Sequence, residues 1–413
     1  MIRRNITSNL LNALADTPVV LLNGARQSGK STLVKAIAEG GHPAAYFNLD
    51  DVSALGAVRH DAAGFLSGLD GPVVIDEIQR APELFMAIKS AVDRNRRPGR
   101  FLLTGSANIL LLPRLSESLA GRMEILSLWP FSQGEINGIK EAFVDKLFEK
   151  RLPRFPLNKK EGINIIDRII AGGYPEAVSR TVPARRKAWF DSYITTILQR
   201  DVRDIADIDG LSDMPRLLSL IAIRSPSLLN FAEISRTIAI PQTTLKRYMM
   251  LLEATFLIRN LPAWSGHLGK RLVKTSKLIM CDTALMAHLF GANRERIVSA
   301  GLIGPLLENF VIMELQKQIT WSEIRPKMFH FRTQTGQEVD IVLEDSSGRL
   351  VGIEVKASAT VGAKDFNGLK ALAEITGNNF IRGIILYTGD NIIPFGNNLH
   401  VLPVSAIWSK NSA

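Results

Sequence analysis

Residues 24–31 read Gly-Ala-Arg-Gln-Ser-Gly-Lys-Ser, the pattern G-x-x-x-x-G-K-[ST] of a phosphate-binding loop. Gly24 and Gly29 can adopt backbone angles that a side chain forbids, so amide N–H groups can converge on phosphate oxygens. Lys30 adds a positive charge near the β and γ phosphates, and Ser31 offers a hydroxyl to Mg²⁺. The stretch therefore predicts a site for ATP and Mg²⁺.

The flanking sequence has the order that such a loop requires. Residues 17–22 predict a buried strand before the loop, and residues 32–39 predict a helix whose N-terminus directs its partial positive charge at the phosphate. The alternative is a glycine-rich turn with an incidental lysine. The predicted nucleotide-binding residues are Gly24, Ala25, Arg26, Gln27, Ser28, Gly29, Lys30, Ser31 and Thr32.

A second apolar run, residues 73–77, ends in two carboxylates, as a Walker B strand does. We expect Asp76 to hold Mg²⁺ together with Ser31, and Glu77 to polarise the attacking water as general base. The alternative is that these acids are solvated residues of a turn.

The third run, residues 101–103, is followed by Thr104 and Ser106. Here the chain resembles the AAA+ superfamily, in which the strand after Walker B ends in a polar sensor that touches the γ-phosphate. The resemblance implies that Thr104 or Ser106 is this sensor, and the sequence does not choose between them. It also implies an arginine finger, for which Arg122 is the first candidate and Arg114 the second; the alternative is a helix-end arginine that neutralises the dipole.

Composition narrows the class of protein. The 413 residues suggest two to four domains. A net charge of +10 indicates a polyanionic partner, nucleic acid first and DNA before RNA. The single cysteine, Cys281, excludes a disulfide framework and fits a cytoplasmic protein. The N-terminus lacks the apolar core of a signal peptide, and no run of 18 apolar residues predicts a membrane span.

The order of patterns predicts an α/β protein of four parts. Alternating strands and helices over residues 1–135 predict a parallel sheet of the P-loop NTPase type, and residues 136–210 predict a helical lid or linker. Residues 211–290 predict a winged helix-turn-helix whose second helix is capped by Asn230 or Ser227, with a wing at residues 257–261 and 270–280. Its third helix would present four side chains to DNA, unless the domain binds protein or closes over ATP; these are Gln242, Thr244, Lys246 and Arg247.

Residues 291–413 carry a second candidate site on a predicted αβββαβ order. Asp340 lies on the middle strand, and Glu354 and Lys356 face one side of the next strand, so two carboxylates and a lysine could hold a second Mg²⁺ for phosphodiester hydrolysis. This resembles the PD-(D/E)XK nuclease superfamily and a restriction-endonuclease-like fold, with Glu308 as an extra helical acid and Val339 where the signature has proline. The alternative is a solvated strand face.

The whole chain resembles one family, the bacterial and archaeal AAA+-type ATPases with a C-terminal DUF4143 domain. The motifs that carry this resemblance are residues 24–31, 49–51, 75–77, 103–106, 119–122, 172–175 and 336–340.

The family resemblance implies an ATPase that turns over Mg-ATP, with AAA+-like homo-oligomers as the assembly. Three hypotheses stay open. The first is an ATPase that acts on nucleic acid, the second a nucleotide-regulated, Mg²⁺-dependent DNA nuclease, and the third a nucleotide-gated switch that binds a protein partner without being an enzyme.

Overall fold

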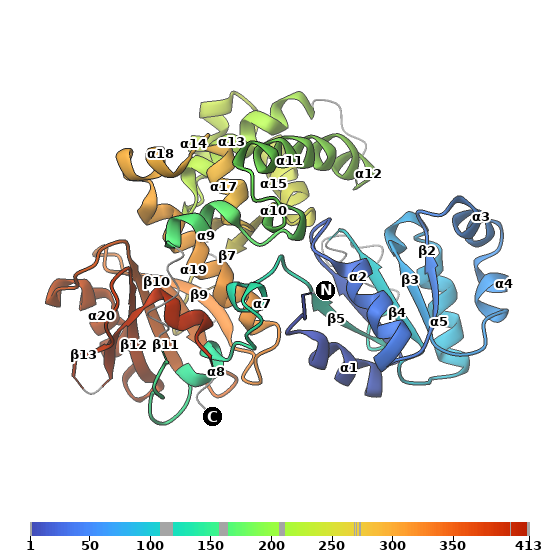
Figure 1. Ribbon diagram of the computed structural model, residues 1–413, viewed down its shortest axis with the longest axis horizontal. Helices are drawn as coiled ribbons and strands as arrows, with labels where there is room; N and C mark the ends of the chain where they lie inside the picture. Colours follow the sequence, from blue (N-terminus) through green and yellow to red (C-terminus); the bar gives the residue numbers. More distant parts are fainter. Residues whose placement is uncertain are drawn as a thin grey trace. The chain divides into compact units, whose positions relative to one another are not determined.

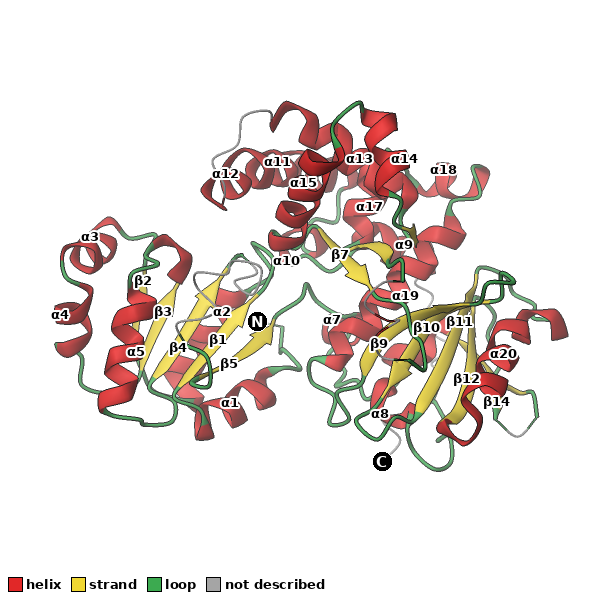
Figure 2. Ribbon diagram, turned by 180° about the vertical axis from the view of Figure 1, so that it is seen from behind, coloured by secondary structure: helices red, strands yellow, loops and turns green. Residues whose placement is uncertain are grey.

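The computed structural model describes residues 2–107, 119–156, 164–205, 211–267, 269, 271, 274–396 and 398–410. The chain forms two compact units. The first unit comprises residues 4–130 and 250–257, and the second comprises residues 1–3, 131–249 and 258–413. Figures 1 and 2 label the elements of each unit from two sides.

The first unit is built on a five-stranded sheet in the order β2-β3-β4-β1-β5, with every pair parallel. Every residue of β1, β3 and β4 is buried, as expected for parallel strands covered on both faces. This confirms the predicted parallel sheet. The elements are α1 (Thr7–Asp16), β1 (Val19–Asn23), α2 (Lys30–Ala36), β2 (Ala45–Asn48), α3 (Val52–His60), α4 (Ala62–Ser67), β3 (Val73–Asp76), α5 (Leu84–Arg94), β4 (Phe101–Gly105) and β5 (Met123–Ser127).

The second unit begins with a mainly helical part. Its helices are α7 (Gln133–Ile136), α8 (Phe143–Leu147), α9 (Ile165–Ala171), α10 (Pro175–Val178), α11 (Pro183–Thr196), α12 (Val202–Ile205), α13 (Met214–Arg224), α14 (Phe231–Ile238), α15 (Gln242–Ala254), α17 (Thr283–Leu289) and α18 (Arg294–Ser299). The last residues of α15, from residue 250 on, count with the first unit. Asn230 rather than Ser227 caps α14, because its side chain accepts from the Glu233 amide at 3.1 Å.

A small antiparallel sheet in the order β6-β8-β7 accompanies these helices. Its strands are β6 (Ser227–Leu228), β7 (Ile258–Leu261) and β8 (Lys277–Met280). The second wing strand is therefore shorter than the predicted residues 270–280. The winged-helix interpretation and the domain boundaries within this unit stay predictions.

The turn at residues 172–175 is held by hydrogen bonds and packing against the start of α17. Gly172 has φ +66°, and a Cβ there would lie 2.6 Å from Oδ1 of Asp282. Asp282 accepts from the amides of Gly173, Ala284 and Leu285, and so caps α17 and holds the turn. Gly172 of this motif is thus explained by packing around one buried carboxylate.

The C-terminal part has a six-stranded mixed sheet in the order β13-β14-β12-β11-β10-β9. β9, β10 and β11 pair antiparallel, whereas β11, β12 and β14 pair parallel. The predicted αβββαβ order is confirmed. The elements are α19 (Ile303–Ile319), β9 (Lys327–Arg332), β10 (Glu338–Glu344), β11 (Leu350–Lys356), α20 (Asn367–Thr376), β12 (Phe380–Tyr387), β13 (Ile393–Pro394) and β14 (Leu399–Pro403).

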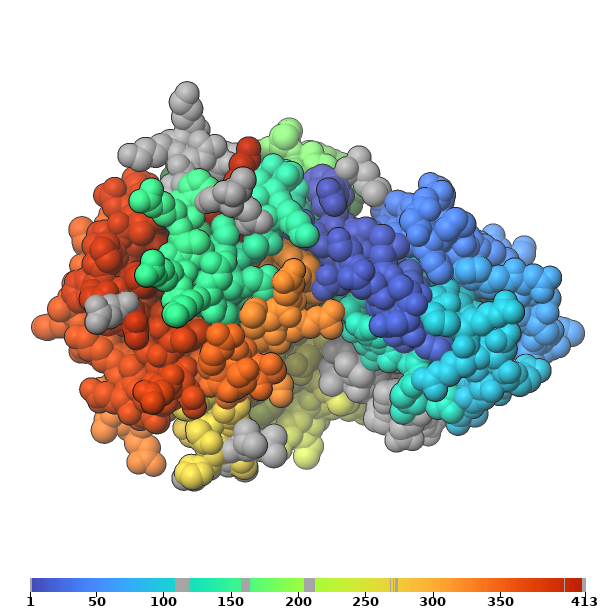
Figure 3. Space-filling model, turned by 90° about the horizontal axis from the view of Figure 1, so that it is seen from below, coloured from blue at the N-terminus to red at the C-terminus, as the bar shows by residue number. Residues whose placement is uncertain are grey.

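The segment that contains α8 packs on this C-terminal part, as Figure 3 shows in green beside red. The Asp145 carboxylate accepts from the Ile324 amide at 3.1 Å, and the Arg349 guanidinium donates to the Phe148 carbonyl at 3.4 Å. Residues 141–156 therefore pack on the C-terminal part. Of the predicted lid or linker, residues 136–210, the segment 157–163 lies outside the described residues.

Candidate nucleotide site and C-terminal acidic cluster

The loop between β1 and α2 has the backbone that the glycine pattern predicts. Gly24 has φ +152°, Gly29 has φ +97° and Gln27 has φ +59°. A Cβ on Gly24 would lie only 2.1 Å from the Leu128 carbonyl oxygen, so this position admits no side chain. Packing against the chain after β5, together with left-handed backbone, therefore fixes the course of the loop.

Lys30 is buried in this loop and turns back onto it. Its Nζ donates to the carbonyls of Gly24 at 2.9 Å and Ala25 at 3.0 Å. The Ser28 hydroxyl is buried and has no hydrogen-bond partner in the part of the chain that the structure describes. An ammonium and an unsatisfied hydroxyl thus share one cradle, and both suit phosphate oxygens.

The other loop residues surround this cradle. Ser31 and Thr32 lie in the first turn of α2, whose N–H groups have no intrahelical acceptors. Arg26 is partly buried and Gln27 is exposed.

Asp76, at the end of β3, is buried and held by two hydroxyls. Tyr46 donates to its Oδ2 at 2.5 Å, and Thr104 donates to its Oδ1. Burial, and then the bond to Asp76, raises the pKa of Tyr46, so its phenol stays a donor. The carboxylate is therefore oriented in advance, as a metal ligand of the Walker B type requires.

The two sensor candidates make different contacts. Thr104, besides its bond to Asp76, accepts from the Glu77 amide at 3.0 Å. Ser106 accepts from the Gln79 side chain at 2.8 Å, and the same Gln79 amide nitrogen also donates to the Glu77 carboxylate. Gln79, which the sequence reasoning missed, therefore bridges the predicted general base and one sensor candidate.

Arg4 also supports the loop and was missed. This buried guanidinium donates to the Ser28 carbonyl at 2.8 Å and to the Trp129 carbonyl at 2.5 Å. It joins the phosphate-binding loop to the end of the unit. No sequence pattern marks it, because its partners are main-chain atoms 24 and 125 residues away.

Arg122, the first arginine-finger candidate, pairs with Asp93 at 2.6 Å and donates to the Ala120 carbonyl at 3.1 Å. Asp93 lies in the last turn of α5, so the ion pair joins that helix to the start of β5. Arg114 lies outside the described residues. The finger role of Arg122 stays a prediction.

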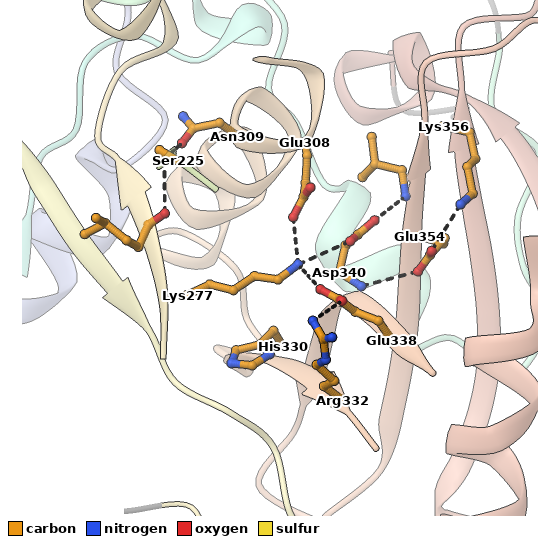
Figure 4. Close-up of polar contacts among 12 residues, drawn as sticks. Ser225, Lys277, Glu308, Asn309, His330, Arg332, Glu338, Asp340, Glu354 and Lys356 are labelled. Atoms are coloured by element: carbon orange, nitrogen blue, oxygen red, sulfur yellow. Dashed lines mark hydrogen bonds and ion pairs between the residues drawn. The ribbon is translucent and has the colours of Figure 1, made fainter. Parts of the chain in front are cut away.

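The C-terminal candidates come together on β10 and β11 (Figure 4). The Asp340 carboxylate accepts from the Val355 amide at 2.9 Å, and the Glu354 carboxylate accepts from the Asp340 amide at 3.3 Å. Lys356 lies 3.3 Å from Glu354. Adjacent strands therefore bring these three side chains into one place, as predicted.

A second lysine, which the sequence reasoning missed, lies among the acids. Lys277 Nζ, from β8, lies 2.7 Å from Glu338 Oε1, 2.8 Å from Glu308 Oε1 and 3.3 Å from Asp340 Oδ1. Only 4% of its side chain is exposed. We refer to Glu308, Glu338, Asp340 and Glu354 as the acidic cluster. Glu338 could have been found, since it lies two residues before Asp340 and on the same strand face.

Burial and mutual repulsion shift the pKa values of carboxyl groups in this cluster. Burial, and then the Asp340 charge, raises the pKa of Glu308 to about 8 and that of Glu354 to about 8. Although burial opposes it, Lys277 lowers the pKa of Glu338. Burial also opposes ionisation of Lys277, but Asp340, Glu308 and Glu338 together raise its pKa. The lysine is therefore a cation at neutral pH.

No group of three or more His, Cys, Asp or Glu side chains is placed to hold a metal ion among the residues that the structure describes. Because the Lys277 ammonium already pairs with three of its four acids, the acidic cluster does not fit a second Mg²⁺ as it stands. In the same described ranges, no helix is both long and apolar enough to cross a membrane.

Three protein families match parts of the chain. Residues 16–137 match an AAA domain, AAA_14, and residues 303–407 match DUF4143, a domain of unknown function. Residues 163–296 match DUF8612, also described as a domain of unknown function.

Two relatives match over nearly the full chain. These are uncharacterized protein Rv2008c of Mycobacterium tuberculosis and uncharacterized protein Mb2031c of Mycobacterium bovis, each 31% identical over 412 residues, or 99% of this chain and 85% of the relative.

Solved structures give a more distant likeness. The Holliday junction branch migration motor RuvB of Thermotoga maritima is 20% identical and covers 63% of this chain and 90% of its own, with a TM-score of 0.31. AMPPCP-bound DnaA of Aquifex aeolicus is 15% identical and covers 60% of this chain and 86% of its own, with a TM-score of 0.29. At such TM-scores the likeness carries no argument about function.

Proposed function

Because this chain belongs to the family of AAA-type ATPases with a C-terminal DUF4143 domain, we propose that it binds Mg-ATP at residues 24–32 and hydrolyses it. One observation supports this most. Buried Lys30 and the Ser28 hydroxyl, which has no partner among the described residues, lie in a loop whose backbone excludes a side chain at Gly24. Phosphate binding to such a loop is favoured, because the polar groups of the loop gain hydrogen-bond partners when phosphate binds.

The chemistry follows from the side chains. Lys30 exchanges backbone carbonyls for phosphate oxygens, and the amides of the first turn of α2 add donors. Ser31 and Asp76 would hold Mg²⁺, which supplies charge neutralisation on the phosphates when bound. Glu77 accepts a proton from the attacking water, and Gln79 holds the Glu77 carboxylate in place.

Phosphate release with Mg-ATP tests the proposal on the wild type, Lys30→Ala and Glu77→Gln. We expect the rate of ATP hydrolysis to fall about 100-fold or more in both variants, since each removes a group that acts on the transferred phosphoryl. Lys89→Ala removes a lysine of α5 that is not part of the loop, and this variant should turn over as the wild type. Absence of turnover in the wild type, or an unchanged rate in Lys30→Ala, contradicts hydrolysis at this loop.

The same assay distinguishes the ATPase from the hypothesis of a nucleotide-gated switch. A nucleotide-gated switch binds ATP tightly, hydrolyses it very slowly and holds its partner in one nucleotide state only. Tight binding without measurable turnover would therefore favour the switch over the ATPase.

A nucleic-acid task is the second part of the proposal, with DNA before RNA. The order α13, β6, α14, α15, β7, β8 and the sheet order β6-β8-β7 support a winged helix. In its third helix, Gln242, Lys246 and Arg247 are exposed and Thr244 is partly exposed. With a net charge of +10, the chain is suited to a polyanion.

DNA binding is tested by fluorescence anisotropy at several salt concentrations. We expect affinity to fall steeply with salt and to weaken in Lys246→Ala and Arg247→Ala, but not in Lys370→Ala, which removes an exposed lysine of α20. A flat salt dependence would contradict DNA as the partner and favour a protein.

Nuclease activity is the alternative, supported by the arrangement of Asp340, Glu354 and Lys356. It predicts cleavage of supercoiled DNA with Mg²⁺ or Mn²⁺ that is lost in Asp340→Ala and Lys356→Ala. Homo-oligomers and a cytoplasmic location also stay proposals; mass measurement with and without ATP tests the first.

A further inference from the structure

The position of Lys277 gives the acidic cluster its own cation. An ammonium group has three N–H donors. The three nearest acceptors are carboxylate oxygens of Glu308, Glu338 and Asp340, at 2.8, 2.7 and 3.3 Å. Figure 4 shows the side chain reaching from β8 to the point where these acids converge.

Four further oxygens of the cluster are also engaged. Asp340 Oδ2 accepts from the Val355 amide, Glu354 Oε2 accepts from the Asp340 amide, and Glu354 Oε1 pairs with Lys356. Glu338 Oε2 accepts from Arg332 at 3.2 Å. A divalent cation at this point would have to displace a buried ammonium and would meet like-charge repulsion from it.

Oxygen-rich clusters of this kind hold Mg²⁺ or Mn²⁺ when the carboxylates are not already paired. Here one monovalent cation, covalently part of the chain, stands where such an ion would bind.

We propose that Lys277 is a built-in replacement for a metal ion in the acidic cluster. The wild-type cluster takes up no divalent cation, and the C-terminal part uses its nuclease-like arrangement to fasten β8 rather than to cleave a phosphodiester. Neutralising Lys277 frees Glu308, Glu338 and Asp340 and turns the cluster into a metal site.

Mn²⁺ binding to the full chain without nucleotide tests this, by electron paramagnetic resonance of free Mn²⁺. We expect Lys277→Gln to bind an additional Mn²⁺ per chain relative to the wild type, and to melt at a higher temperature when Mn²⁺ is added. The double variant with Asp340→Asn should lose both gains. Lys327→Gln, an exposed lysine at the start of β9, makes the same charge change and should bind as the wild type.

Two results overturn the proposal. One is an unchanged Mn²⁺ stoichiometry in folded Lys277→Gln. The other is Mn²⁺ bound by the wild type and lost in Glu308→Gln or Asp340→Asn, and this second arm needs no Lys277 variant to fold. Neither arm involves the nucleotide loop, so the outcome is independent of the proposed ATPase activity.

Discussion

The two units each contain a buried lysine surrounded by oxygens, and the oxygens differ. Lys30 donates to neutral carbonyls of its own loop, whereas Lys277 pairs with three carboxylates from α19 and β10. A lysine that donates to neutral carbonyls gains an opposite charge when an anionic phosphate binds. A lysine among carboxylates is already neutralised, and removing it exposes buried negative charge. The first arrangement therefore suits an external ligand, and the second suits an internal contact.

The largest expected effect concerns the internal contact. Lys277→Ala leaves Glu308, Glu338 and Asp340 without their common cation, so we expect the free energy of unfolding to fall by about 3–5 kcal/mol. Urea unfolding followed by circular dichroism measures this. Lys327→Ala serves as the control and should change little. A loss below about 1 kcal/mol in Lys277→Ala would place the lysine with ordinary surface ion pairs.

Gly24→Ala examines the backbone on which the nucleotide loop depends. Gly24 has a φ of +152°, and the added Cβ would lie 2.1 Å from the Leu128 carbonyl oxygen, so the loop has to move. Strain of about 1–3 kcal/mol should lower ATP affinity by about tenfold or more. Calorimetric titration gives this value. Gly56→Ala, where a Cβ meets nothing within 4 Å, is the matched control. Equal affinities in the two variants would show that the loop tolerates a side chain.

The stability of the fold should depend on pH through the protonation of Glu308 in the acidic cluster. The pKa of Glu308 lies near 8 in the folded chain against 4.5 ordinarily, so the folded state binds the extra proton. Its contribution to stability is fully present below about pH 4.5 and is lost as pH rises through about 8. Glu308→Gln should therefore match the wild type near pH 5 and exceed it above pH 8.

The difference in slope between Glu308→Gln and the wild type is at most about 1.4 kcal/mol per pH unit, since one proton is involved. Unfolding measured from pH 5 to pH 9 provides it. Parallel curves would mean that Glu308 is ionised throughout this range.

The smallest effect is expected at the other lysine of the cluster. Lys356 is 31% exposed and lies 3.3 Å from Glu354 and 3.8 Å from Asp365. Lys356→Gln should cost less than about 1 kcal/mol in unfolding by urea. A loss as large as that of Lys277→Ala would remove the distinction between the buried and the half-exposed lysine.

Local patterns in the sequence predicted the strand-loop-helix order around residues 24–32 and the left-handed backbone of its glycines. The residues from Gly24 to Thr32 are contiguous, and the parallel sheet follows from alternation of strands and helices, so little depends on distant contacts. The same holds for Asp340, Glu354 and Lys356, because neighbouring strands of a hairpin place them together.

The residues that were missed act across long distances in the sequence. Lys277 is 31 residues from Glu308 and 63 from Asp340, and no periodicity joins them. Arg4 reaches main-chain carbonyls, which leave no trace in the sequence of its partners. Gln79 lies near Glu77, where the backbone has a left-handed φ of +60°, and its side chain donates to that carboxylate. Packing, rather than local pattern, decided these contacts.

Calorimetric titration of Mg-ATP into the wild type, Lys30→Ala and Lys277→Gln tests the contrast between the two lysines most directly. We predict binding heat for the wild type and for folded Lys277→Gln, and none for Lys30→Ala. Absence of heat in the wild type, or undiminished heat in Lys30→Ala, would contradict the assignment of residues 24–32 as the nucleotide site.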